Sequence, residues 1–276
     1  MTERLAVSVA GVTKVFNAGR ADQVTALSDV DLTVADGEFV SLIGPSGCGK
    51  STLLRLVADL IAPTAGTVTV AGRPAAEARR RQDYGIAFQQ AGLFEWRTVL
   101  RNVELPLELR GMSRTDRKAR AVEMLDLVGL SDFTGHYPAQ LSGGMQQRVA
   151  IARALAVSPP LLLMDEPFGA LDEMARERLQ SELLQICAQT GTSVVFVTHS
   201  ISEAVFLSNR VVVMSPRPGT ITASIEVDLP SRDDAARQSP LYFDAITGVR
   251  KALRGGRPPA ARTGNDRAMA EPDPAG

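Results

Sequence analysis

The segment that decides the fold is Gly44-Pro45-Ser46-Gly47-Cys48-Gly49-Lys50-Ser51-Thr52, which fits the pattern G-x-x-x-x-G-K-[ST]. An apolar run precedes it at residues 38–43, and a helix-like run follows it at residues 52–57. The glycines let several backbone N–H groups point at one centre, and the N-terminus of the following helix adds its positive end. This order of strand, loop and helix predicts an anion site.

The side chains at the end of this segment indicate that the anion is a nucleotide phosphate. We expect Lys50 to reach the β- and γ-phosphates and the Ser51 hydroxyl to ligate Mg²⁺. A glycine-rich turn that binds nothing is the alternative. Cys48 is either a small residue that fits the turn or a thiolate favoured by amides and Lys50, in which case alkylation would block nucleotide binding.

Composition excludes several other classes of protein. The chain has 276 residues, 45% of them hydrophobic and 22% charged, with a net charge of −1, as in an ordinary soluble globular protein. There is no basic excess that would indicate nucleic acid, and we expect no nucleic-acid partner. The apolar runs are too short to span a bilayer, the N-terminus lacks the features of a signal peptide, and two distant cysteines make no disulfide framework. We therefore expect a cytosolic protein.

An antiparallel β layer is predicted before the phosphate loop. Residues 5–9, 13–16, 24–27 and 30–34 alternate as half-buried strands do. Phe16 ends one of these strands, and the layer could bring its ring onto the nucleotide base; a core phenylalanine is the competing interpretation.

A helical insertion is predicted after the strand at residues 85–88. Apolar residues recur at helical spacing from residue 99 to about residue 129, where we expect Pro106 and Gly111 to interrupt the helix. Ser142-Gly143-Gly144 then begins another helical run. Ser142 has the character of an N-cap with uncovered amides, which would make a second anion site; a simple capped helix is the alternative.

Polar residues follow three buried strands and predict the chemistry. Gln89 follows the first strand, where its amide would lie beside the metal and its water. Asp165 and Glu166 lie at the carboxyl end of the apolar strand expected at residues 161–167, at the edge where open α/β sheets bind ligands. We expect Asp165 to support Mg²⁺ through its water shell and Glu166 to polarise a water. His199 ends the strand at residues 192–198 and could hydrogen-bond the γ-phosphate.

At this point residues 5–230 resemble the nucleotide-binding subunit of an ATP-binding cassette (ABC) transporter. Residues 44–51 match the Walker A loop, Gln89 the Q-loop, residues 141–146 the signature motif and residues 161–166 Walker B. Ala170-Leu171-Asp172 matches the D-loop and His199 the switch histidine, and all six motifs occur in the family's order.

The resemblance implies a fold and a cycle. It implies an α/β P-loop NTPase with a RecA-like core, an N-terminal antiparallel β subdomain and an inserted α-helical subdomain at about residues 90–157. Two subunits would pair head to tail, so that each ATP lies between one Walker A loop and the other chain's Ser142-Gly143-Gly144. Glu166 would be the catalytic base, Gln89 would sense Mg²⁺, Asp172 would communicate across the dimer, and Phe16 would take the adenine-stacking position.

A narrower resemblance is to importer ATPases for nitrate, sulfonates, taurine and thiamine precursors or riboflavin. It rests on Trp96-Arg97-Thr98-Val99, on residues 164–172 and on Arg217-Pro218-Gly219. Glu95 departs from the proline that usually precedes the tryptophan, Met145 from the usual signature glutamine, and Ser200 from a common aspartate. This resemblance implies a separate membrane permease that contacts residues 89–96, an extracytoplasmic solute-binding protein, and a peripheral place at the cytoplasmic membrane face.

Beyond residue 230 we expect a helical extension to residue 254 and a disordered tail at residues 255–276. Three alternative functions stay open: an exporter or regulatory ATPase, a soluble ABC ATPase acting on DNA or ribosomes, and a P-loop kinase. The short distance between Gln89 and Ser142 and the single cassette fit the second poorly, and a kinase leaves the signature motif unexplained.

Overall fold

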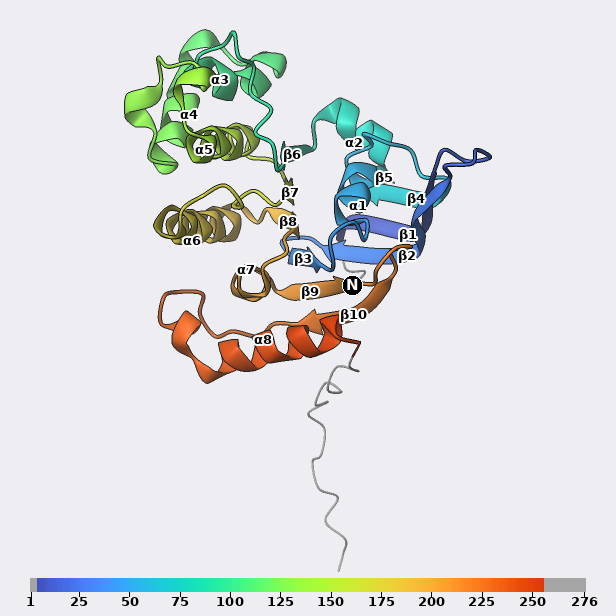
Figure 1. The fold of residues 1–276 in the computed structure, drawn as a ribbon. Helices are drawn as coiled ribbons and strands as arrows, with labels where there is room; N and C mark the ends of the chain where they lie inside the picture. Colours follow the sequence, from blue (N-terminus) through green and yellow to red (C-terminus); the bar gives the residue numbers. More distant parts are fainter. Residues whose placement is uncertain (1–3, 256–276) are drawn as a thin grey trace, which may run out of the picture.

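The computed structural model describes residues 4–255 and contains two sheets and a separate group of helices (Figure 1). Residues 256–276 lie outside the described part, and with them nearly all of the tail for which we expect disorder. Within residues 4–255 no helix is both long enough and apolar enough to cross a bilayer.

The larger sheet has six strands in the order β10-β9-β3-β8-β7-β6. They are β3 (Phe39–Ile43), β6 (Tyr84–Ala87), β7 (Leu161–Asp165), β8 (Ser193–Val197), β9 (Arg210–Met214) and β10 (Ile221–Glu226). All neighbouring pairs are parallel except β10 with β9, which form an antiparallel edge. The chain order therefore jumps within the sheet, and the carboxyl ends of β3, β7 and β8 lie side by side.

Both faces of the central strands are buried, which explains their continuous apolar sequences. In β7, Leu161 and Leu163 face a core shared with α1 and the smaller sheet, whereas Leu162 and Met164 face a core shared with the other helices. Strands β3 and β8 alternate in the same way. This packing holds the strand ends in fixed positions.

The smaller sheet is antiparallel, in the order β2-β1-β4-β5. Its strands are β1 (Leu5–Phe16), β2 (Val24–Ala35), β4 (Ala65–Val70) and β5 (Arg73–Pro74). The four short strands expected from the sequence are two long ones, β1 and β2. Their register shifts around Gly11 and Asp29, both with positive φ, so that the alternation breaks while the ladder continues.

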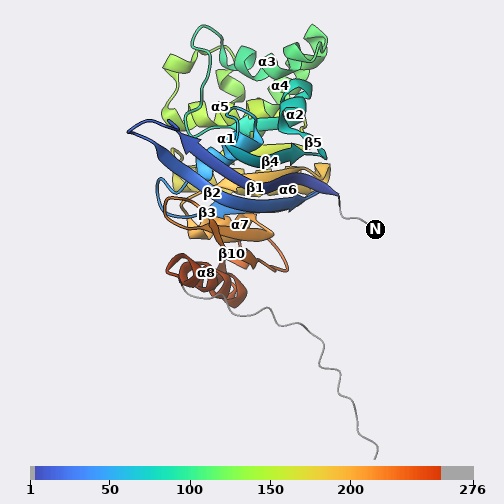
Figure 2. The ribbon, with the colours of Figure 1, turned by 90° about the vertical axis from the view of Figure 1, so that its right-hand side faces the viewer.

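The helices divide into three groups, of which α1 and α2, packed on the smaller sheet, form the first. The helices are α1 (Lys50–Val57), α2 (Ala75–Arg81), α3 (Val99–Leu109), α4 (Arg114–Leu127), α5 (Gly143–Leu155), α6 (Glu173–Thr190), α7 (Ile201–Leu207) and α8 (Pro240–Leu253), with 3₁₀ turns at Ser131–Phe133, Pro138–Gln140 and Ala236–Gln238. Helix α1 contacts strands of both sheets, and α3, α4 and α5 pack on one another as a separate group, as Figures 1 and 2 show. Helices α6, α7 and α8 lie on the other face of the larger sheet, with α8 packed on α7, β9 and β10.

One sequence expectation about these helices is wrong. Pro106 does not interrupt α3, which continues through it to Leu109 and buries Leu107. A proline removes one backbone hydrogen bond from a helix interior, and here the helix continues for three residues beyond it because Leu107 packs in the core. The interruption lies at Gly111, which has φ +74° between α3 and α4.

Candidate functional site

The glycine-rich loop connects β3 to α1 and folds over its own lysine. Gly49 takes the left-handed conformation, φ 107°, as the residue before the helix. A Cβ atom there would lie 2.6 Å from Leu27 Cδ2, so the position requires glycine. Lys50 is buried, and its Nζ donates to the carbonyl oxygens of Gly44 at 2.8 Å and Pro45 at 3.2 Å. The ammonium group is therefore held inside the loop.

Two oxygen atoms meet at the foot of the loop. The Ser51 hydroxyl at the start of α1 donates to Asp165 Oδ1 at the end of β7 over 2.8 Å. Burial raises the pKa of the Asp165 carboxyl above its usual range, and the hydrogen bond from Ser51 acts in the opposite direction. A hydroxyl and a carboxylate so placed are the hard oxygen donors that Mg²⁺ prefers.

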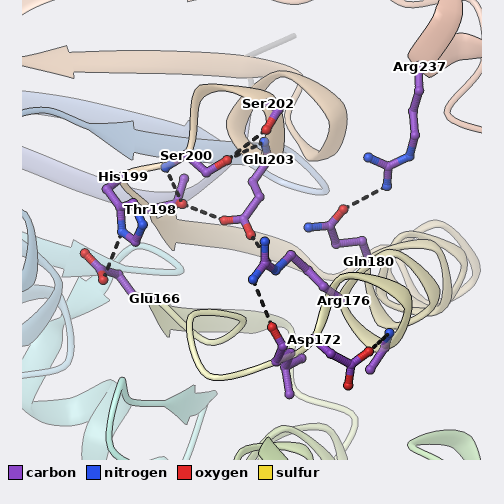
Figure 3. A network of polar contacts seen from close by, with 12 residues as sticks. Glu166, Asp172, Arg176, Gln180, Thr198, His199, Ser200, Ser202, Glu203 and Arg237 are labelled. Carbon is purple, nitrogen blue, oxygen red and sulfur yellow. Dashed lines mark hydrogen bonds and ion pairs between the residues drawn. The ribbon is translucent and has the colours of Figure 1, made fainter.

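Glu166 is the centre of a second polar cluster. Its backbone has φ +47°, a left-handed conformation that costs a residue other than glycine on the order of 1–3 kcal/mol. Backbone hydrogen bonds to Val197 O and from Gly169 N hold this conformation. Glu166 Oε2 lies 3.2 Å from His199 Nδ1, a contact drawn in Figure 3, and 3.4 Å from Gln89 Nε2.

These groups surround one cavity of about 600 Å³. Its lining consists of Phe16, Val24, Ala26, Ser46, Gly47, Cys48, Gly49, Lys50, Ser51, Thr52, Gln89, Glu166, His199 and Arg217. Most of the residues predicted for nucleotide contact thus come together, and the partly exposed ring of Phe16 lies at this cavity. Gly44 and Pro45 lie behind it as acceptors for Lys50.

The sequence interpretation assigned no site role to Arg217. Its Nε and Nη2 each donate to Gly47 O at 3.3 Å, which adds a second cation to the cavity besides Lys50. The available signal was the turn Arg217-Pro218-Gly219 after β9, and nothing in the sequence places that turn against the phosphate loop. Val24 and Ala26 of β2 were also missed.

Another set of predicted residues lies away from this cavity. In the described part of the chain, the cavity lining excludes Ser142, Gly143, Gly144 and Asp172. Ser142 caps α5 by accepting from Met145 N at 3.3 Å, which confirms the predicted N-cap. Ser142 and Gly143 are exposed, and neither residue lines the cavity at the chain's own phosphate loop.

Cys48 lies beside Lys50 as expected, with its sulfur 3.8 Å from Lys50 Nζ, but the thiol is not accessible to solvent. Its side chain is fully buried in the folded chain, and its sulfur lies where a Cβ on Gly44 would come within 2.9 Å of it. Alkylation from solvent would require the loop to open. The other interpretation, a small residue that fills the turn, agrees with this packing.

Comparisons with known proteins identify the family to which the chain belongs. A family model described as ABC transporter matches residues 27–169. The chain is 48% identical over 207 residues to the taurine import ATP-binding protein TauB of Yersinia pestis, which covers 75% of this chain and 80% of the relative. It is 43% identical over 260 residues to the nitrate import ATP-binding protein NrtD of Synechocystis, covering 90% and 95%.

A solved structure shows the same architecture. It is the dimeric, post-hydrolysis state of the ATP-binding cassette MJ0796 bound to ADP and Pi, with a TM-score of 0.75 and 38% identity. The match covers 80% of this chain and 99% of that one. The fold and site thus define a P-loop ATPase with a RecA-like core, and the chain belongs to the ABC transporter family. Within that family it is an ATP-binding subunit that hydrolyses ATP.

Proposed function

We propose that this chain powers an importer, by binding ATP–Mg between two copies of itself and coupling hydrolysis to solute uptake through separate permease subunits. The observation that carries the proposal is that the Lys50 loop and the Glu166–His199–Gln89 cluster line one cavity of about 600 Å³, with Asp165 hydrogen-bonded to the lining residue Ser51. This volume lies within the usual range for a small-molecule site. The relatives named for taurine and nitrate import favour uptake of a small polar nutrient.

Within this proposal each cavity residue has a role in binding. Phe16 stacks on adenine, residues 44–52 surround the phosphates, and Lys50 leaves its carbonyl acceptors to contact the β- and γ-phosphates. Ser51 and Asp165 fit Mg²⁺, because this ion usually takes only a few oxygen ligands from the protein and fills its remaining positions with phosphate oxygens and water. Mg²⁺ held there would neutralise charge on the phosphate oxygens, with Gln89 beside it.

The chemical step follows from the second cluster. Glu166 accepts a proton from the attacking water and orients it, since its carboxylate lies at the cavity between two polar side chains. His199 contacts the γ-phosphate and holds Glu166 in place. Lys50 and the loop amides stabilise the charge that develops on the phosphoryl oxygens.

The exposed face of Ser142 and Gly143 supports a head-to-tail dimer. A helix N-terminus with uncovered amides suits an anion, yet in this chain it is exposed and lies outside the cavity lining. In the proposed dimer, Ser142-Gly143-Gly144 of one copy covers the phosphates held by the other, and Asp172 contacts the partner. The described chain by itself would then hold two incomplete halves of two sites.

The loop at residues 89–96 is the proposed contact with the permease. Trp96 is 73% exposed and packs on Phe94, with ring centroids 5.0 Å apart. Arg153 donates to the carbonyls of Ala91 and Gly92 and also lines an adjoining apolar hollow of about 280 Å³. A cytoplasmic helix of the permease would place an apolar face there, which puts this chain at the cytoplasmic membrane face.

Uptake measurements in host cells that lack this chain test the importer proposal. We expect the deletion to reduce uptake of one labelled solute among nitrate, taurine and a thiamine-precursor pyrimidine, and a plasmid copy to restore it. A Trp96→Ala copy should fail to restore uptake while its purified protein hydrolyses ATP normally. Phe243→Ala, another exposed aromatic, is the matched control and should restore uptake. Unchanged uptake with increased retention of a solute would indicate an exporter and contradict the proposal.

A further inference from the structure

A closed ring of hydrogen bonds joins the residues on either side of His199 at the start of α7. Ser200 N donates to Thr198 Oγ1 at 3.0 Å, and the Thr198 hydroxyl donates to Glu203 Oε2 at 2.6 Å. Glu203 N donates in turn to Ser200 Oγ at 3.3 Å, which caps the helix. In an ordinary capping box the glutamate side chain would take the N–H of the cap residue itself. Here Thr198 is inserted between them, and the ring fixes the backbone on both sides of His199.

Glu203 also extends this ring to a second loop. Its side chain is 11% exposed, and Oε1 lies 3.6 Å from Arg176 Nε of α6. Arg176 Nη2 donates to the carbonyl oxygen of Leu171 at 2.9 Å, one residue before Asp172, which caps α6. Figure 3 shows this chain of contacts running from the ring around His199 through Glu203 and Arg176 to the residues at Asp172.

The ion pair between Arg176 and Glu203 is slightly too long to include a hydrogen bond. Arg176 Nε is buried and has no hydrogen-bond partner within the described residues, although the Glu203 carboxylate lies only 3.6 Å away. A buried donor left unpaired is destabilising, so a small movement of either loop that closed this gap would be favoured. The pair can thus respond to a displacement of the loop at residues 169–172.

We propose that Glu203 and Arg176 are positioning residues that couple the loop at residues 169–172 to the placement of His199 against Glu166. The inference rests on the proposed roles of His199 and Glu166. When a partner subunit contacts Asp172, it displaces the loop at residues 169–172. The displacement is passed from Leu171 O to Arg176 and then to Glu203, and it tightens the ring that holds His199. Neither residue lines the cavity, so both act on turnover and not on nucleotide affinity.

Steady-state ATP hydrolysis and ATP affinity, measured on the same purified full-length variants, test the coupling. We expect Arg176→Ala and Glu203→Gln each to lower kcat about tenfold and to leave the Kd for ATP within about twofold, because only placement is lost. Arg176→Lys should recover part of the rate. The double variant Arg176→Ala/Glu203→Gln should lose no more than either single variant, as expected for two residues that act through one contact.

Arg178→Ala is the matched control, because Arg178 lies on the same helix and pairs with Glu182 at 2.8 Å away from both loops. Its kcat should stay at the wild-type value. An unchanged kcat in both single variants, an equal loss in Arg178→Ala, or additive losses in the double variant would overturn the coupling. Should Arg176→Ala fail to fold, Glu203→Gln alone decides, since glutamine keeps an acceptor for Thr198. If Glu166→Gln retains turnover, the proposed function fails independently of this coupling.

Discussion

Glu166 illustrates what a single residue adds to a sequence pattern. Its position after an apolar strand predicted a carboxylate at the ligand edge of a sheet. Its left-handed backbone, φ +47°, could not be predicted, because the conformation is imposed by hydrogen bonds to β8 and to Gly169. That turn directs the side chain to His199 and Gln89, so the chemistry depends on a local strain that no residue type indicates.

The two cysteines provide a test at the residue scale. Cys48 is fully buried and Cys187 is 9% exposed, and burial raises the pKa of the Cys187 thiol to about 12. We expect iodoacetamide at pH 8 to label neither thiol in the folded chain and both in urea, as mass spectrometry would show. Rapid native labelling of Cys48 would contradict its buried position and restore the alternative of a reactive loop thiol.

The same burial predicts a dependence of stability on pH. The pKa of the Cys187 thiol is raised from its ordinary value of 9.0 to about 12 in the folded chain, so the unfolded chain releases this proton first as pH rises. The stabilisation from Cys187 is complete below pH 9 and declines toward pH 12, by up to about 1.4 kcal/mol per pH unit. Urea unfolding of the wild type and of Cys187→Ala at pH 8 and pH 10 should show a smaller loss in the variant. An equal loss of stability in the wild type and in Cys187→Ala between pH 8 and pH 10 would contradict this role of the Cys187 thiol.

At the scale of elements, strands β3, β7 and β8 and the start of α1 were predictable because each is a continuous apolar run with a defined end. The strands β1 and β2 were not predicted as continuous. Bulges at Gly11 and Asp29 shift the side-chain alternation without breaking the ladder of backbone hydrogen bonds. A search for alternating apolar residues therefore ends a strand at each bulge, although the strand continues. The pairing of the strands and the contact of Arg217 with Gly47 join residues that are distant in sequence, so a local pattern does not predict them.

Gly219 shows how one element supports another. A Cβ atom there would lie 2.0 Å from Cys48 O, a backbone atom that cannot move without moving the phosphate loop. Gly219 also donates to Ala26 O and accepts from Ser28 N, so β2 and the turn after β9 hold the loop together. We expect Gly219→Ala to weaken ATP binding more than tenfold and to lower the free energy of unfolding by about 1–3 kcal/mol.

Gly248→Ala in α8 is the control for that substitution. A Cβ atom at Gly248 meets nothing within 4 Å, and alanine favours a helix over glycine by up to about 1 kcal/mol. This variant should bind ATP normally and unfold at an equal or higher urea concentration. Normal ATP binding by Gly219→Ala in isothermal titration calorimetry would mean that the turn after β9 does not position the loop.

At the scale of the whole molecule, the larger sheet brings together groups from the ends of β3, β6, β7 and β8, and the small sheet adds Phe16. The sequence predicted that the phosphate loop, Gln89, Glu166 and His199 meet, but it did not predict that Arg217 joins them. Only the family resemblance indicated that the N-terminus of α5 would lie outside this cavity. In the proposed dimer this helix end would complete the partner's site, which a pattern in one chain cannot show.

The most direct test of the account is ATP hydrolysis and ATP-dependent dimerisation of the wild type beside Glu166→Gln, measured by phosphate release and light scattering. Glutamine keeps the size of Glu166 and its contacts but cannot accept the proton of the attacking water. We predict that the variant loses turnover by a factor of at least about a hundred and accumulates as an ATP-bound dimer, while the wild type cycles. A variant that hydrolyses ATP like the wild type, or that stays monomeric at saturating ATP, would contradict the role of Glu166 or the shared site.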